Sequence, residues 1–363
     1  MSGAGLIGCD QPLAQAYDLA LVDLDGVARR GDQPIDHASA SLAQAGDWGM
    51  ALMYATNNAS MSPGDVSTQL NGLGIACQDQ DIVTSAQAAA ALLAQRLEPG
   101  SPVLVVGGAG LRDAVTAEGF ICLTVADMQA QRDAVQRDSV QGGPGQAGLQ
   151  ATVKPAAVVQ GFSPDLTWKD LAEAAYAVAA GAWYVASNMD MSLPTAQGYA
   201  PGNGSLVSAV VAATGVTPDA AGKPSPAMYQ LAVDRRTARN PLVIGDRLDT
   251  DLAGARSAGY AGLHVLTGVS SARDDVLADA SFRPHFIGAD LQALLVPHPV
   301  PQARGQGWWG IGDRQARVVD GRLELDAQGP VGIDIVRCAC AAAWESADAG
   351  HRVDPASVPE FSV

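Results

Sequence analysis

The sequence predicts an α/β fold built on a doubly wound parallel sheet, with a second α/β unit inserted into it and a small extension at the C-terminus. Short apolar runs alternate with stretches of helical spacing, which is the pattern of βαβ units. Three of the runs, at 19–22, 50–55 and 242–244, end on polar residues that could take part in catalysis or ligand binding. Ligands of open α/β sheets bind at the carboxyl ends of the strands, so we expect a site there.

The composition is that of a soluble globular protein with room for two domains. The chain has 363 residues, of which 48% are hydrophobic and 17% are charged. Its formal net charge of −16 argues against nucleic acid or an anionic membrane as a partner. A small phosphorylated metabolite stays compatible with this charge, because a bound cation and one or two lysines can invert the field inside a cleft.

The five cysteines show no metal-binding spacing, and we interpret them as free thiols of a cytoplasmic protein. No apolar run approaches the length needed to span a membrane. The sequence does not determine the oligomeric state, and a homodimer is one assembly that it allows.

The stretch Asp23-Leu24-Asp25-Gly26-Val27 follows the first apolar run. Side chains alternate along a strand, so Asp23 and Asp25 would emerge on the same side at its carboxyl end. Gly26 lets the backbone turn away without a Cβ in its path. Two carboxylates this close favour a hard cation such as Mg²⁺, and one can act as nucleophile while the other transfers a proton. Taken alone, the pattern is equally that of a turn with two solvated acids.

Two further stretches suit a phosphate group. Thr56, Asn57 and Asn58 follow the second apolar run, and their hydroxyl and amides can hold phosphate oxygens through neutral hydrogen bonds. An ordinary polar turn or helix cap fits them as well. Lys223 lies on a tight Gly-Lys-Pro turn and is a fixed point charge, or else an exposed turn lysine. The turn is not a P-loop, because Pro224 stands where Ser or Thr should follow the lysine.

The run at 242–244 leads into Asp246, Asp249 and Asp251. If the segment turns into a helix after Asp249, then Asp246 and Asp251 can approach a cation from different depths.

The inserted unit has its own strands at 102–107, 156–160 and 183–186. The glycines at 107–110 lack the spacing and the distant acid of a dinucleotide loop. Residues 131–152 are rich in Gln, Gly, Asp and Arg and predict a solvated loop or hairpin insertion. Beyond Pro297, an Asp-Gly turn at 320–321 between apolar-rich arms predicts a hairpin, and 333–347 a helix. We therefore expect a core domain at 1–80 and 196–298, an inserted domain at 81–195 and a ββα extension at 299–363.

The four polar stretches, in this order, resemble the haloacid dehalogenase (HAD) superfamily of aspartyl-nucleophile phosphatases. Thr56-Asn-Asn and an α/β insertion before Gly222-Lys-Pro look like subclass IIA, which includes p-nitrophenyl, pyridoxal and nucleotide phosphatases. The surroundings of Asn188-Met-Asp190, the segment 201–205 and the C-terminal extension look most like actinobacterial glycerol-3-phosphate phosphatases. The resemblance implies a Rossmann-like core with an α/β cap domain.

The resemblance also implies roles for individual residues. Asp23 attacks phosphorus, and Asp25 protonates the leaving alkoxide and then deprotonates water. Thr56, Asn57, Asn58 and Lys223 hold the phosphoryl oxygens. Mg²⁺ is bound by Asp23, the backbone carbonyl of Asp25 and Asp246, and Asp251 orients its waters.

Substrate choice is expected to depend on the cap. The strand end at Ser187-Asn188-Met189-Asp190 has no aromatic or arginine cluster to stack a nucleobase or pyridine ring. Asn188 and Asp190 suit a short polyol such as that of glycerol 3-phosphate, unless they merely cap the secondary structure of this unit. Two other classes stay open: an Asp-x-Asp glycosyltransferase and a catalytically silent binding protein. Transfer of the phosphoryl group to an acceptor other than water is also compatible with the sequence.

Overall fold

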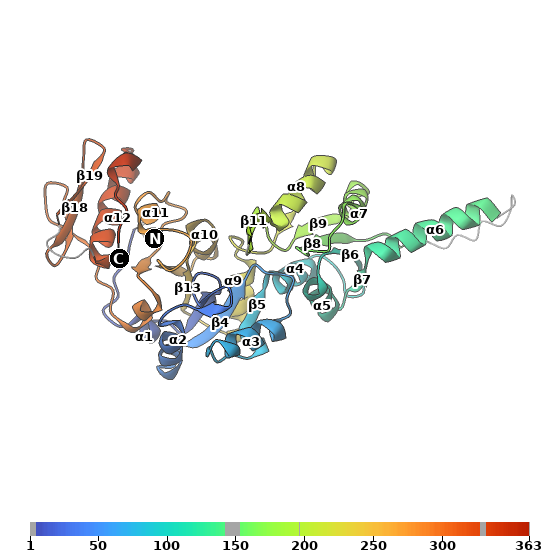
Figure 1. The fold of residues 1–363 in the computed structure, drawn as a ribbon, viewed down its shortest axis with the longest axis horizontal. Coiled ribbons are helices and arrows are strands. Elements are labelled where there is room, and N and C mark those ends of the chain that lie inside the picture. The colour runs from blue at the N-terminus through green and yellow to red at the C-terminus, as the bar shows by residue number, and fades with distance from the viewer. Residues whose placement is uncertain (1–4, 142–152, 196, 327–331, 363) are drawn as a thin grey trace. The chain divides into compact units, whose positions relative to one another are not determined.

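The computed structural model describes residues 5–141, 153–195, 197–326 and 332–362. The chain divides into two compact units, each of α/β type (Figure 1). The first unit comprises Met1–Ala55, Ser67–Ile82 and Ala232–Val363, and the second comprises Thr56–Val66 and Val83–Leu231. The domain boundaries expected from the sequence stay predictions.

A six-stranded sheet organises the first unit. Its strand order is β15-β14-β13-β1-β4-β5, and the strands are β1 (Leu19–Asp23), β4 (Ala51–Thr56), β5 (Ile82–Thr84), β13 (Pro241–Gly245), β14 (Ala261–Val265) and β15 (Phe286–Gly288). Neighbours from β15 to β4 pair in parallel. The first four residues of β1 are buried, as expected for a strand that is covered on both faces. The chain leaves β1 toward β4 and returns at β13 toward β15, so the topological switch point lies between β1 and β13.

Helices accompany these strands, which confirms the predicted doubly wound α/β fold. They are α1 (Leu13–Ala16), α2 (Ala38–Asp47), α3 (Pro63–Gly72), α9 (Ala227–Arg236), α10 (Ala253–Ala258) and α11 (Ala272–Val276), and a short hairpin joins β2 (Arg29–Arg30) to β3 (Gln33–Pro34). In the part of the chain that the structure describes, no helix is both long and apolar enough to cross a bilayer.

The second unit has a sheet of its own with the order β12-β9-β8-β6-β7. The strands are β6 (Pro102–Val106), β7 (Ile121–Leu123), β8 (Ala157–Gln160), β9 (Trp183–Ala186) and β12 (Asp219–Ala220), all paired in parallel. The helices are α4 (Ser85–Ala94), α5 (Ala109–Ala117), α6 (Val125–Gln141), α7 (Trp168–Ala179) and α8 (Asn203–Thr214), and the hairpin is β10 (Ser192–Thr195) with β11 (Gly198–Pro201). A core of small and branched side chains joins α7 and α8 to this sheet.

Helix α6 corrects one expectation from the sequence. Residues 131–141 were expected to be loop, but they continue the helix that begins at Val125. Composition misled here, because Gln, Arg and Ala favour a helix and no Gly or Pro interrupts the segment before residue 142. The Arg132 guanidinium also pairs with the buried Glu173 of α7. The remainder of that predicted loop, residues 142–152, lies outside the described residues.

The C-terminal module, as we call residues 302–326 and 332–348, is part of the first unit. An antiparallel sheet of β16 (Gln302–Ala303), β17 (Trp309–Ile311), β18 (Arg314–Val319) and β19 (Arg322–Asp326) lies beside α12 (Ile333–Asp348). The predicted hairpin is confirmed, since Asp320 and Gly321 both have positive φ between β18 and β19. The predicted helix is confirmed as well. Strands β16 and β17 were not predicted because they have only two and three residues.

Candidate active site

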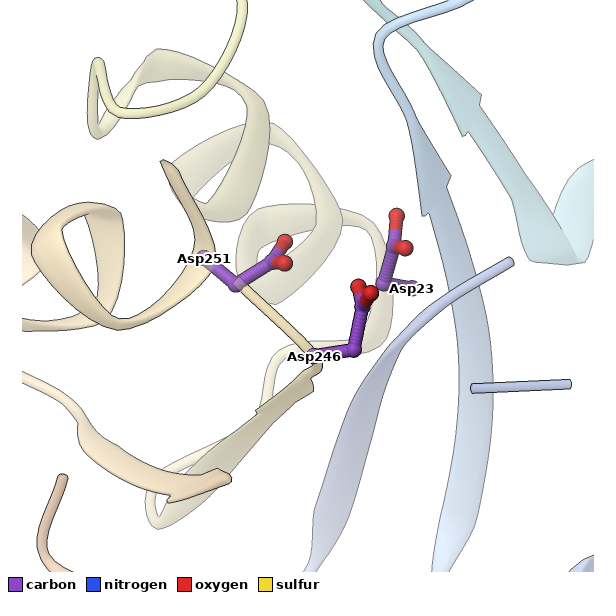
Figure 2. A group of neighbouring side chains, drawn as sticks. All are labelled: Asp23, Asp246 and Asp251. Carbon is purple, nitrogen blue, oxygen red and sulfur yellow. The ribbon is translucent and has the colours of Figure 1, made fainter. Parts of the chain in front are cut away.

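Three carboxylates converge at the switch point of the six-stranded sheet. One oxygen each from Asp23, Asp246 and Asp251 lies within 4.8 Å of the other two (Figure 2). Asp23 is the last residue of β1, and Asp246 directly follows β13, the neighbouring strand. Asp251 comes from the π-helical turn Leu248–Leu252 that follows. Adjacent parallel strands end side by side, so the topology itself brings the first two together.

Glycines enclose these carboxylates so closely that no other residue fits. A Cβ on Gly26 would lie 2.3 Å from Oδ2 of Asp246, and one on Gly268 would lie 1.9 Å from the same atom. A Cβ on Gly245 would lie 2.1 Å from the Cβ of Asp251. Gly26 also has a φ of +89°, which only glycine adopts readily. From the sequence, the turn alone explains Gly26, whereas the structure adds a steric reason.

The donor set fits a hard divalent cation. Asp246 and Asp251 are each 1% exposed, and all three groups offer only oxygen. Placing three carboxylates this close, two of them buried, is costly unless a cation offsets their repulsion. Oxygen-only donor sets select Mg²⁺ or Ca²⁺ over softer metals. The Val269 N–H donates to Oδ2 of Asp246 at 2.7 Å and so fixes the orientation of that carboxylate.

Asp25 and Asp249 lie outside this group. The Asp25 side chain is 62% exposed and pairs with Arg29 at 3.2 Å, while Arg29 itself is nearly buried. Asp249 pairs with Arg247, whose hydrogen bonds hold the pKa of that carboxyl below its usual range. The general acid role of Asp25 and its backbone contact to the metal stay predictions. Arg29 was missed, although its spacing four residues after Asp25 was visible in the sequence.

The residues expected to bind phosphate lie around Asn57, in the second unit. Oδ1 of Asn57 accepts from the Lys223 N–H at 2.9 Å, and its Nδ2 donates to the Lys223 carbonyl at 3.3 Å. The turn at Gly222 fits closely, because a Cβ there would lie 2.7 Å from Oδ1 of Asn57. Lys223 is 3% exposed and is therefore no solvated turn lysine.

The neighbouring side chains are also engaged. Oγ1 of Thr56 accepts from the Asn58 N–H at 3.1 Å. Oδ1 of Asn58 accepts from the N–H and the hydroxyl of Ser60, at 2.9 and 2.7 Å. Such contacts are those of a polar turn. The phosphate-binding roles of Thr56, Asn57, Asn58 and Lys223 stay predictions.

Asn188 and Asp190 belong to the same network. Nδ2 of Asn188 donates to the Asn57 carbonyl at 2.8 Å, and Asn188 is 4% exposed. Both carboxylate oxygens of Asp190 accept from Nδ2 of Asn57, at 3.1 and 3.2 Å. These contacts favour the structural interpretation, in which both residues hold the loop. Their role in substrate choice stays a prediction.

No histidine has an expected role from the sequence, and His264 was thereby missed. This fully buried side chain lies on β14, opposite Gly245 of β13. Its Nε2 is 3.2 Å from the Asp246 carbonyl, and its Nδ1 is 2.8 Å from the Asp275 carboxylate. Burial acts to lower the pKa of His264, but the charge and hydrogen bond of Asp275, together with Asp246, raise it overall. The available signal was a histidine inside the apolar strand that comes next along the chain after the strand leading into Asp246.

Comparisons with known proteins agree with this geometry. A family model described as haloacid dehalogenase-like hydrolase matches residues 20–121, and a HAD-hydrolase-like model matches residues 220–294. The chain is 41% identical to D-glycerol 3-phosphate phosphatase of Mycobacterium tuberculosis over 342 residues, covering 92% of this chain and 88% of that protein. An acid sugar phosphatase of Staphylococcus saprophyticus is 30% identical over 77% of this chain and 97% of its own length.

Solved structures show the same likeness. Glycerol phosphate phosphatase of M. tuberculosis in complex with magnesium has a TM-score of 0.77 and 41% identity, covering 92% of each chain. Its calcium complex has a TM-score of 0.77 and 42% identity, covering 93% of this chain and 90% of the other.

Proposed function

The chain belongs to the haloacid dehalogenase-like hydrolases, and we propose that it is a Mg²⁺-dependent phosphatase of small phosphate monoesters, with glycerol 3-phosphate among its better substrates. One observation supports this above all. Three carboxylates meet at the switch point of the parallel sheet, inside a cradle that only glycine backbone permits.

The reaction proceeds in two steps. The Asp23 carboxylate attacks phosphorus, the bond from phosphorus to the ester oxygen breaks, and Asp25 gives its proton to the leaving alkoxide. Water then attacks the aspartyl-phosphate, and Asp25 takes a proton from that water as inorganic phosphate leaves. Asp23 is restored, so no other reactant is consumed. The exposure of the Asp25 side chain suits a group that must exchange protons with solvent and substrate.

Asp23, Asp246 and Asp251 would hold the metal, together with the Asp25 backbone carbonyl. When bound, Mg²⁺ offsets the negative charge of the nucleophile and of the phosphoryl group. Thr56, Asn57, Asn58 and Lys223 hold the phosphoryl oxygens in this proposal. The near-complete burial of Lys223 on a tight turn supports its part, because it makes the side chain a fixed point charge and not a solvated surface lysine.

The substrate assignment rests on the relative named D-glycerol 3-phosphate phosphatase, which matches this chain over most of its length. The acid sugar phosphatase at 30% identity makes sugar phosphates the second class to examine. The proposed contribution of Asn188 and Asp190 is to shape the loop that selects the leaving group.

A panel of phosphate monoesters tests the proposal: glycerol 3-phosphate, sugar phosphates, pyridoxal phosphate, nucleotides and p-nitrophenyl phosphate, each with Mg²⁺ and after exhaustive chelation. We expect release of phosphate that depends wholly on the metal, with glycerol 3-phosphate among the highest kcat/KM values. Asp246→Ala should weaken Mg²⁺ binding, and excess metal should restore part of its activity. Asp249→Asn, a carboxylate of the same segment outside the group, is the matched control and should behave as wild type.

Full activity after chelation would refute the metal assignment. A preference above about tenfold for pyridoxal phosphate or nucleotides, which corresponds to roughly 1.4 kcal/mol of discrimination, would refute the substrate and leave the phosphatase in place.

A further inference from the structure

The proposed metal site leads to a role for the C-terminal module. We propose that His264 is a positioning residue for Asp246, and that the C-terminal module fixes this histidine through Trp344 of α12. The inference rests on the proposed function only in taking Asp246 as a metal ligand.

A buried chain of hydrogen bonds runs from the module to the site. The Trp344 indole N–H donates to the Asp275 carbonyl at 2.9 Å. The Asp275 carboxylate faces Nδ1 of His264 at 2.8 and 2.9 Å, and Nε2 of His264 faces the Asp246 carbonyl at 3.2 Å. Trp344 is 2% exposed, and both Asp275 and His264 are fully buried. Both ring nitrogens of His264 face acceptors, so the ring is held from two sides in one orientation.

The loop between β14 and α11 holds the same aspartate by a second route. The Val269 N–H donates to the Asp246 carboxylate, and the Ser270 N–H donates to the Asp246 carbonyl at 3.0 Å. This loop runs directly into α11, which packs on α12 through Ala272 and Val276. The module therefore contacts α11, the helix that carries Asp275 and directly follows this loop.

Further contacts hold the Trp344 side chain in place. The Arg283 guanidinium lies over its ring at 5.3 Å and pairs with Asp348, one turn further along α12, at 2.8 Å. These contacts join α12 to the segment that follows α11. They make the indole a fixed donor, as the positioning of Asp275 requires.

The site needs contacts that hold Asp246 in its orientation. Three carboxylates within 4.8 Å repel one another before a cation arrives, and Asp246 would tend to turn away. Hydrogen bonds to both its carboxylate and its carbonyl keep it in the binding geometry. The module thus prepares the site for the metal, and its effect should appear in Mg²⁺ affinity more than in substrate binding.

Calorimetric titration of the full-length protein with Mg²⁺ tests the inference without turnover. Trp344→Phe removes the indole donor and keeps an aromatic ring, whereas His264→Asn breaks the chain in its middle. Trp309→Phe is the matched control, because Trp309 donates its indole N–H to Glu345 of the same module at 2.7 Å, away from Asp275. Removal of such supporting contacts typically weakens metal binding by about 10- to 100-fold. We expect this for His264→Asn, about threefold to tenfold for Trp344→Phe, and no change for Trp309→Phe.

A purely structural role predicts a different result. If Trp344→Phe lowered the unfolding temperature but bound Mg²⁺ as tightly as Trp309→Phe, the inference would be wrong. The KM of Trp344→Phe for p-nitrophenyl phosphate at saturating Mg²⁺ should equal that of wild type, and a raised KM would also contradict it. If His264→Asn does not fold, the pair of tryptophan variants decides alone. Wild-type protein that binds no Mg²⁺ would instead refute the proposed metal site.

Discussion

The two parallel sheets of this protein share a topology but use their switch points in opposite ways. In the first unit, β1 ends on Asp23 and Asp246 directly follows β13, and the glycines nearby leave space for these carboxylates. In the second unit the switch point lies between β6 and β8, which end next to Gly107 and Gly161. A Cβ on Gly107 would lie 3.0 Å from the Gly161 carbonyl, so these glycines bring two backbones together.

The comparison separates two uses of glycine at strand ends. One set makes room for functional side chains, and the other closes the space where a ligand would bind. It also accounts for the glycine cluster at 107–110. Gly110 packs against the Met61 and Ala59 carbonyls, where its Cβ would lie 2.7 and 3.0 Å away. The fold therefore supplies two candidate sites, and the residues at the strand ends decide which one can do chemistry.

The largest expected effect comes from Asp23→Asn. An amide cannot attack phosphorus, so turnover should fall by something on the order of 10⁶-fold, as for loss of other covalent nucleophiles. Single-turnover assays with p-nitrophenyl phosphate and circular dichroism of the variant measure activity and folding side by side. Appreciable turnover by a folded variant would remove Asp23 from the nucleophile role and place the chemistry elsewhere.

The next test substitutes one glycine from each switch point. Gly26→Ala places a Cβ against the Asp246 carboxylate and forces an unfavourable φ, so we expect Mg²⁺ affinity and kcat/KM to fall by about 10- to 100-fold. Gly107→Ala crowds the Gly161 carbonyl and Leu111, which should cost about 1–3 kcal/mol of stability and leave Mg²⁺ affinity unchanged. Denaturant unfolding and Mg²⁺ titration of both variants measure the two quantities. Equal effects of the two substitutions on Mg²⁺ affinity would contradict the proposed difference between the glycines of the two switch points.

A smaller effect is expected at the loop of Asn188 and Asp190. If these residues choose the substrate, Asn188→Ala and Asp190→Ala should change kcat/KM for glycerol 3-phosphate more than for p-nitrophenyl phosphate. If they only hold Asn57, kcat/KM should fall equally for both substrates. Asn57 contacts Lys223, and both are proposed to hold the phosphoryl group that every monoester has. The ratio of the two kcat/KM values, taken relative to wild type, distinguishes the interpretations. A ratio within about twofold of wild type, roughly 0.4 kcal/mol, would favour the structural role.

The sequence was sufficient for the fold class and for the convergence of Asp23, Asp246 and Asp251. These residues follow apolar runs, and the ends of parallel strands are brought together by topology rather than by side-chain detail. The contacts among Asn57, Asn188 and Asp190 could not be predicted from the sequence. They join residues 131 or more positions apart, and the same amides suit a phosphate, a polyol or a turn equally well.

His264 shows the other limit. Its neighbours in sequence are apolar, and nothing local indicates that Asp275 and the Asp246 carbonyl face its two nitrogens. The prediction for residues 131–141 of α6 was wrong for the opposite reason, because their polar composition alone was taken to indicate a loop.

The last prediction concerns acid stability, which should also differ between the two units. All five histidines of the chain, at 37, 264, 285, 298 and 351, belong to the first unit. Burial lowers the pKa of His285 and of His298 to about 4, with the charges of Arg256 and Arg337 respectively adding to the effect. Nε2 of His298 donates to the Ala293 carbonyl, and its Nδ1 accepts from Arg337, so the neutral ring is the one that fits.

The sign follows from the proton count. An unfolded histidine takes up a proton below about pH 6.5, but these two resist it until about pH 4, so their contribution is fully present above pH 6.5 and is lost as the pH falls toward 4. The loss reaches about 3 kcal/mol for His298 and less for the more exposed His285. Hydrogen exchange at pH 7 and pH 4.5, corrected for intrinsic rates, should show the peptides of the first unit losing more protection than those of the second. His298→Gln can keep both hydrogen bonds without titrating, and it should flatten the pH dependence of unfolding between 6.5 and 4. An unchanged slope in this variant would show that His298 is not the group whose protonation destabilises the first unit.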